Sequence, residues 1–128
     1  MTAISILLIF KIGFTFVTVI MPFMLFSQLK LETLTSSSVA TTTLFRLYGT
    51  STISLLILYG WGIWQAQSGS MPWIVVCVGI FSNLTAPAVI FFTSAGKQQR
   101  ILGAIYGAIG VGLIGFAIFP TAALNSVF

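Results

Sequence analysis

Residues 72–94 have the sequence PWIVVCVGIFSNLTAPAVIFFTS and contain no charged side chain. A helix needs about 20 predominantly apolar residues to cross the roughly 30 Å hydrocarbon core of a bilayer. The stretch has that length, and Pro72 at its start suits the first turn of a helix. It therefore predicts a membrane-spanning helix.

The rest of the chain has a similar composition. Of its 128 residues, 58% are hydrophobic and 5% are charged, with five Lys or Arg, one acidic residue and no His. A soluble domain carries about 25% charged residues, so this chain has too few charges to cover a water-facing surface. The composition predicts an integral membrane protein with a single domain, residues 1–128.

Three further apolar stretches, 4–29, 42–65 and 101–119, have the length of membrane spans. Short polar segments separate the four stretches. We therefore expect an all-α, four-helix membrane bundle with short connections.

Single residues predict details of these helices. Pro22 cannot donate a hydrogen bond to the carbonyl of Thr18, so we expect a bend there. Ser38 or a nearby Thr is expected to cap the second span, and Gly96 to end the third. Pro120 should end the regular part of the fourth span.

The positions of the charges predict an orientation. Basic residues flank the first and third connections, whereas the turn at 65–70 has none; they are Lys30, Arg46, Lys97 and Arg100. Basic residues near helix ends favour the cytoplasmic side, so both termini and the 65–70 turn should lie on the other side. Aromatic residues around that turn are typical of an interfacial belt: Tyr59, Trp61, Trp64 and Trp73.

Lys11 lies well inside the first predicted span, where a charge is costly and often functional. Thr15 and Thr18 follow on the same helix face and complete a polar stripe. The stripe can contact an ion or ligand. Alternatively the Lys11 side chain snorkels to the interface, which is the interpretation we favour.

Arg46 lies near the start of the second span. Its guanidinium can bind a lipid phosphate or a substrate anion. Alternatively, it can pair with Glu32, the one acidic residue of the sequence. A structural or lipid-contact role is the favoured interpretation.

Asn83, Thr85 and Pro87 place polar groups deep in the third span. Because Pro87 lacks an N–H, the Asn83 carbonyl loses its helical donor, and such groups must be satisfied inside protein or by water. They can contact a ligand or pigment, or line a pore. We favour hydrogen bonding between helices and expect Asn83 to be buried.

The fourth span has one side of small residues: Gly103, Ala104, Gly107, Ala108, Gly110, Gly112 and Gly115. Larger side chains form the opposite ridge: Leu102, Ile105, Tyr106, Ile109, Leu113 and Phe116. Small residues allow close packing between membrane helices. The small side is expected to contact another helix of the bundle or a neighbouring subunit.

Missing residue types argue against several functions. Without His or a pair of acids, and with Cys77 as a lone thiol, the chain lacks a metal site and the groups of common catalytic sites. A proton-coupled carrier normally needs a membrane carboxylate or His. The chain has no cluster of basic residues that would indicate nucleic-acid binding. We expect no enzyme activity and no required cofactor, while a bound lipid or pigment stays open.

The second span opens with an Arg-x-Tyr-Gly element, Arg46-Leu47-Tyr48-Gly49. With the overall layout, this element resembles the DoxX-like group of small bacterial four-helix membrane proteins, in which such an element opens the second span. The resemblance implies a four-helix bundle and little about activity. We expect a location in the bacterial inner membrane or an equivalent energy-transducing membrane.

Two functional hypotheses follow from the sequence. The first is a non-catalytic accessory subunit, in contact with lipids and with other subunits of a larger membrane complex. The alternative is an oligomeric component of a transporter or channel for ions or small molecules, with Lys11, Asn83 and Arg46 along its pathway.

Overall fold

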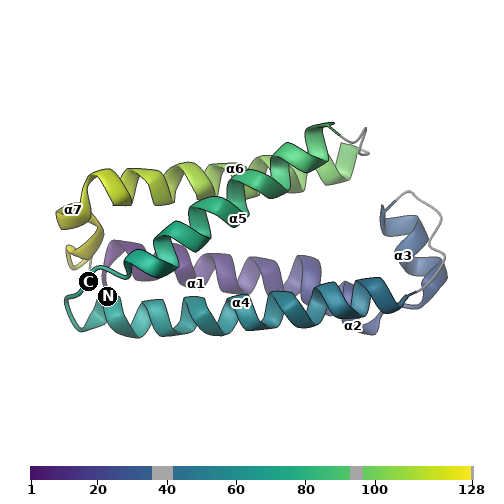
Figure 1. Ribbon diagram of the computed structural model, residues 1–128, viewed down its shortest axis with the longest axis horizontal. Helices are drawn as coiled ribbons and strands as arrows, with labels where there is room; N and C mark the ends of the chain where they lie inside the picture. Colours follow the sequence, from purple (N-terminus) through teal and green to yellow (C-terminus); the bar gives the residue numbers. More distant parts are fainter. Residues whose placement is uncertain (36–41, 93–96, 128) are drawn as a thin grey trace.

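The computed structural model describes residues 1–35, 42–92 and 97–127, and nearly all of these residues are helical (Figure 1). The elements in chain order are α1 (Ala3–Thr15), the π-helix η1 (Phe16–Ile20), α2 (Met21–Leu25), α3 (Gln28–Thr35), α4 (Thr43–Gln67), α5 (Trp73–Phe92), α6 (Lys97–Ile118) and α7 (Pro120–Leu124). The predicted all-α class is confirmed.

Three helical runs within the described residues are long and apolar enough to cross a membrane: Ala3–Leu25, Trp73–Phe92 and Gln99–Ile118. They indicate a multi-pass integral membrane protein. Helix α4 has 25 residues and packs along the first of these runs (Figure 1). It is less apolar because Arg46 and several Ser and Thr residues occupy its first half.

The first span differs from the prediction at its end. Helicity stops at Leu25 rather than at residue 29, because Phe26 has an extended backbone with φ −74° and ψ 147°. The chain then forms α3, which overlaps the end of the predicted span and the start of the polar connection that follows it. Before Pro22, where the sequence predicts a bend, the helix is locally irregular: residues Phe16–Ile20 form η1, and the Met21 N–H donates to the Phe16 carbonyl.

The other boundaries lie within a few residues of the predicted ones. Thr42 precedes α4, but its side chain makes no capping hydrogen bond, so the capping prediction is wrong for this residue. Ser38 and Gly96 lie outside the described residues. Pro120 follows a break at Phe119 and starts the short helix α7 rather than simply ending α6.

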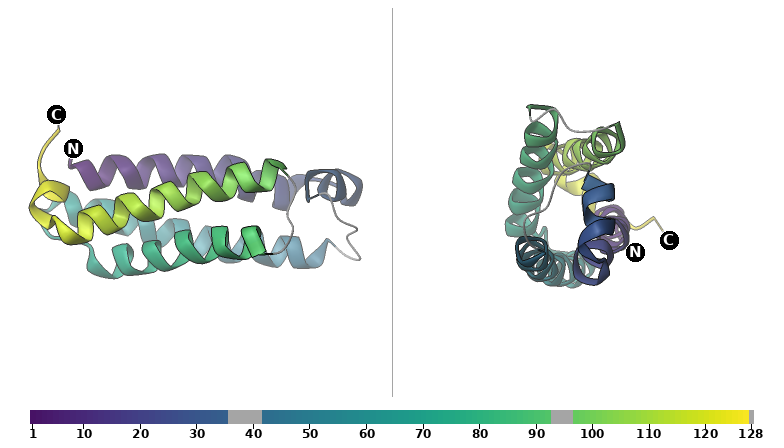
Figure 2. Two further views of the ribbon diagram at one scale, coloured as in Figure 1. Left: turned by 90° about the horizontal axis from the view of Figure 1, so that it is seen from above. Right: turned by 90° about the vertical axis from the view of Figure 1, so that its right-hand side faces the viewer.

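The long helices converge at one end and separate toward the other. Both termini and the α4–α5 turn lie at the same end (Figure 1). Helix α5 starts beside α4 and then packs along α6, so the α5–α6 pair moves away from α2 and α4 toward the end that carries α3 (Figures 1 and 2). A cavity lined by residues of α2, α3, α4, α5 and α6 lies at the end where the helices separate.

The apolar core fills the end where the helices converge. Its fully or nearly fully buried members come from all the long helices: Ile4, Leu8, Tyr59, Ala66, Val75, Val76, Ile109, Leu113 and Ala123. Ile109 and Leu113 belong to the predicted ridge of the fourth span, so part of that ridge faces the core. Leu113 packs on Gly79 so closely that a Cβ there would lie 2.7 Å from its Cδ1 atom.

Candidate functional site

Polar side chains lie in the interior of the bundle, between the apolar core and the end of the bundle that carries α3. Lys11 and Asn83 are only 3% and 1% exposed, and Thr15 and Thr52 are also buried. With Ser82 and Tyr106, these residues line a chamber of about 80 Å³. Such a volume corresponds to about two or three water molecules at roughly 30 Å³ each.

Lys11 points into the bundle. Its Nζ atom lies 4.5 Å from the centre of the Tyr59 ring and 6.0 Å from that of Tyr106. The expectation that Lys11 snorkels to the interface is therefore wrong. The two ring faces attract the ammonium, but no described residue accepts a hydrogen bond from it.

Asn83 has a buried oxygen without a partner. Its Nδ2 atom donates to the Gly79 carbonyl at 2.6 Å and lies 3.4 Å from Ser82 Oγ, both on its own helix. Its Oδ1 atom has no hydrogen-bond partner in the described part of the chain. Burial is as predicted, but the hydrogen bond that joins helices here runs between the Tyr59 hydroxyl and Ser82 Oγ, at 3.0 Å.

The predicted polar stripe of the first span faces α6. The Tyr106 hydroxyl lies 3.3 Å from both Thr15 Oγ1 and Thr18 Oγ1. Thr18 also donates to the Phe14 carbonyl at 2.8 Å. Lys11, Thr15 and Thr18 thus share one inward face, and Tyr106 connects two of them to α6.

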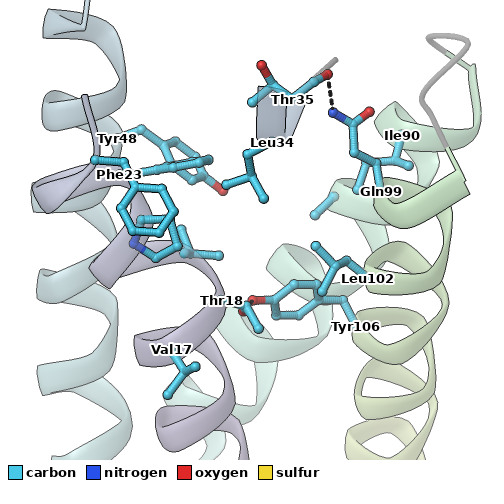
Figure 3. Close-up of a pocket in the computed structure, with 14 residues that line it drawn as sticks. Val17, Thr18, Phe23, Leu34, Thr35, Tyr48, Ile90, Gln99, Leu102 and Tyr106 are labelled. Atoms are coloured by element: carbon cyan, nitrogen blue, oxygen red, sulfur yellow. Dashed lines mark hydrogen bonds between the residues drawn. The ribbon is translucent and has the colours of Figure 1, made fainter. Parts of the chain in front are cut away.

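A larger, mostly apolar cavity of about 460 Å³ lies beside this chamber, toward α3 (Figure 3). Leu34 and Thr35 of α3 lie at one end of it, where Gln99 Nε2 donates to the Thr35 carbonyl at 2.6 Å. Thr18 and Tyr106 lie at the other end (Figure 3). The chamber and the cavity share four lining residues: Val19, Tyr48, Ala86 and Tyr106. Small-molecule sites commonly measure about 300–1,000 Å³.

Arg46 and Thr85 are not part of this site. Arg46 donates to the Phe23 and Phe26 carbonyls, both at 3.1 Å, and so satisfies the carbonyl end of α2. Thr85 is exposed and donates to the Phe81 carbonyl of its own helix. Arg46 therefore has a structural contact, and Thr85 faces away from the interior.

The small side of α6 packs mainly within the chain. Gly103, Gly107 and Gly110 face α5, and Gly112 faces Leu7 of α1. At Gly110 an added Cβ would lie 2.9 Å from Leu84 Cδ2. Ala108 is exposed, and nothing lies within 4 Å of a Cβ added at Gly115.

The sequence interpretation missed Tyr59, Tyr106, Thr52 and Ser82 as members of the polar interior. The sequence predicts Tyr59 in the interfacial belt, whereas the structure has it fully buried. One signal was available: Thr52 and Tyr59 are seven residues apart and share a helix face with the buried Gly62 and Ala66. The three tryptophans of the predicted belt are exposed.

Comparisons with models of known protein families, with curated protein sequences and with solved structures find no match to this chain. The resemblance to DoxX-like proteins stays a prediction.

Proposed function

We propose that this chain is a non-catalytic membrane protein with four spans whose interior binds a lipophilic small molecule. The observation that carries the proposal is the apolar cavity of about 460 Å³ next to a polar chamber. Apolar pockets with a few polar groups at one side are typical of small-molecule sites.

The length of α4 supports a fourth span. Its 25 residues extend about 37 Å at 1.5 Å per residue, which exceeds the roughly 30 Å hydrocarbon core. Arg46 lies near the end of the helix, where its charge is close to the interface. An even number of spans also agrees with both termini lying at one end. With the basic residues at the opposite end, we place the termini on the non-cytoplasmic side of the bacterial inner membrane or an equivalent membrane.

The walls of the cavity support a lipophilic occupant. They include aromatic and aliphatic side chains from both halves of the bundle, among them Phe23, Phe26, Ile90 and Leu102. The cavity is only partly enclosed, so an occupant can enter it without unfolding of the bundle.

The test is to detect the occupant directly. Ala86 lines both spaces, whereas Ala88 on the same helix is exposed. Ala86→Trp fills the cavity, and Ala88→Trp is the matched control. Native mass spectrometry from mild detergent should show a small-molecule adduct on the wild type and on Ala88→Trp, and not on Ala86→Trp. A wild-type protein without adduct, or an equal adduct on a folded Ala86→Trp variant, would refute the proposal.

Binding and transport are separate functions of such a cavity. A transporter component would move the bound compound between the two sides of the membrane. Efflux from liposomes loaded with the identified adduct, compared between wild type and Ala86→Trp, distinguishes a transporter from a binding protein.

The accessory-subunit hypothesis is the second candidate, and open glycines on the bundle surface favour it. Gly13, Gly60 and Gly115 have no atom within 4 Å of an added Cβ, so another helix can approach closely there. Gly107 and Gly112 are unsuitable probes because they contact Pro87 and Leu7 of this chain. Gly115→Leu should instead release the protein from a larger complex on a native gel. Migration of the wild type as a monomer or small homo-oligomer would refute this candidate.

A further inference from the structure

We propose that the bound molecule is a long-chain carboxylic acid, with its carboxyl group in the polar chamber and its chain in the adjoining cavity. This inference rests on the proposed function, because it names the class of ligand that the cavity takes.

The first argument is charge. Lys11 is buried, and no described carboxylate faces its ammonium; the acidic residue Glu32 lies on α3, where its Oε1 atom accepts from Gln28 Nε2 at 3.2 Å. The Tyr59 and Tyr106 rings attract the ammonium but carry no net charge. A buried charge is costly unless it is paired. An anion supplied from outside the chain is therefore the partner that the chamber lacks.

The second argument is hydrogen bonding. Lys11 offers donors, and Asn83 Oδ1 is a buried acceptor without a partner in the described residues. A carboxyl group has oxygens for Lys11, and in its protonated form it also has an O–H for Asn83. The net charge of Lys11 and the carboxyl group together is zero in both protonation states, ammonium with carboxylate or amine with carboxylic acid. An ester has no O–H and no charge, and an alcohol has no charge.

The third argument is size and continuity. The chamber of about 80 Å³ is large enough for a carboxyl group and too small for a bulky headgroup. The chamber and the cavity share walls at Val19, Tyr48, Ala86 and Tyr106. A single alkyl chain attached to the carboxyl would thus continue directly into apolar surroundings.

The experiment uses the full chain in mild nonionic detergent. Its thermal midpoint is measured against increasing dodecanoic acid, methyl dodecanoate and dodecanol, because a ligand that binds the folded state raises the midpoint. We expect the acid to bind about tenfold or more tightly than the ester and the alcohol, as befits a charge-assisted hydrogen bond. This comparison is made on the wild type and needs no variant.

Two variants locate the effect. Lys11→Met should abolish the preference for the acid, while Lys30→Met, at an exposed lysine, should retain it. Two results overturn the carboxylic-acid inference: equal binding of acid, ester and alcohol, or an acid preference that survives Lys11→Met. Either result leaves binding in the cavity intact, and the chamber then holds water only. Absence of binding by all three compounds, together with a wild type free of adduct, overturns the proposed function as well.

Discussion

The Lys11 ammonium lies 4.5 Å from the centre of the Tyr59 ring, and the Tyr59 hydroxyl lies 3.0 Å from Ser82 Oγ. Three helices, α1, α4 and α5, are therefore linked through one fully buried tyrosine. The contact fixes the lysine side chain toward the interior rather than toward the membrane surface. Contacts between these three helices thus hold the polar residues of the chamber in place.

Replacement of Lys11 by Met should stabilise the ligand-free protein. The change removes a cation–π contact of about 0.5–2 kcal/mol but also a desolvation penalty of several kcal/mol for a buried ion. We expect a higher melting temperature in detergent, measured by intrinsic fluorescence. Lys30→Met is the control, with little change because Lys30 is exposed. A clearly lower melting temperature for Lys11→Met would show that the ammonium has a stabilising partner in the ligand-free protein.

Asn83→Leu should destabilise the bundle by about 1–3 kcal/mol. The change removes the donor to the Gly79 carbonyl and places a branched side chain against Gly110, where an added Cβ would lie 3.2 Å from Asn83 Cβ. Thr85→Leu on the exposed side of the same helix should have little effect. Equal melting temperatures for Asn83→Leu and wild type, combined with loss of transport, would instead indicate a pathway role.

Gly62→Ala and Gly60→Ala should have opposite effects, although the residues are two positions apart on α4. At Gly62 an added Cβ would lie 2.8 Å from Cγ1 of the buried Val75, so the Val75 side chain or its helix must shift. Overpacking of this kind costs about 1–3 kcal/mol. At Gly60 nothing lies within 4 Å, and Ala gains up to about 1 kcal/mol in helix propensity. Similar melting temperatures for the two variants would contradict the α4–α5 contact.

Arg46→Lys should lower stability less than Arg46→Met. The guanidinium donates to two carbonyls, Phe23 and Phe26, that end α2. Lysine has a single nitrogen and keeps part of this contact, whereas methionine keeps none, for a loss of about 1–3 kcal/mol. Thermal melting in detergent gives the order of the three proteins. No difference among them would mean that water satisfies these carbonyls equally well.

A cysteine at Ser68 should react with an impermeant thiol reagent from the non-cytoplasmic side. Ser68 is exposed in the turn at the same end as both termini, and Cys77 must first be replaced because it is also exposed. A cysteine at Thr33 on α3 should show the reverse accessibility in intact cells. Labelling of the Ser68 position only after permeabilisation would invert the orientation.

The long helices were predictable because each is a nearly unbroken apolar run between polar segments. The end of the first span was not, since the apolar Phe26 continues the run while its extended backbone breaks the helix. Helix α3 was missed for a related reason. Its Ser- and Thr-rich surroundings suggest turns, but Leu31 is fully buried, and Gln99 Nε2 of α6 donates to the Thr35 carbonyl at the end of the segment.

Part of the site was visible in the sequence. Lys11, Thr15 and Thr18 follow a helical spacing, and Asn83 stood out by its depth. The direction of the Lys11 side chain was not visible in the sequence, because a lysine at that depth can reach either the interface or the interior. The choice depends on Tyr59 and Tyr106, which come from other helices, and no local pattern reveals that they meet Lys11.

The two ends of the described chain are joined by backbone hydrogen bonds. The Ala3 N–H donates to the Asn125 carbonyl and the Val127 N–H to the Met1 carbonyl. During synthesis Ala3 enters the membrane long before Asn125 leaves the ribosome. The hydrogen bonds that join the two ends therefore form only after α7 has been synthesised.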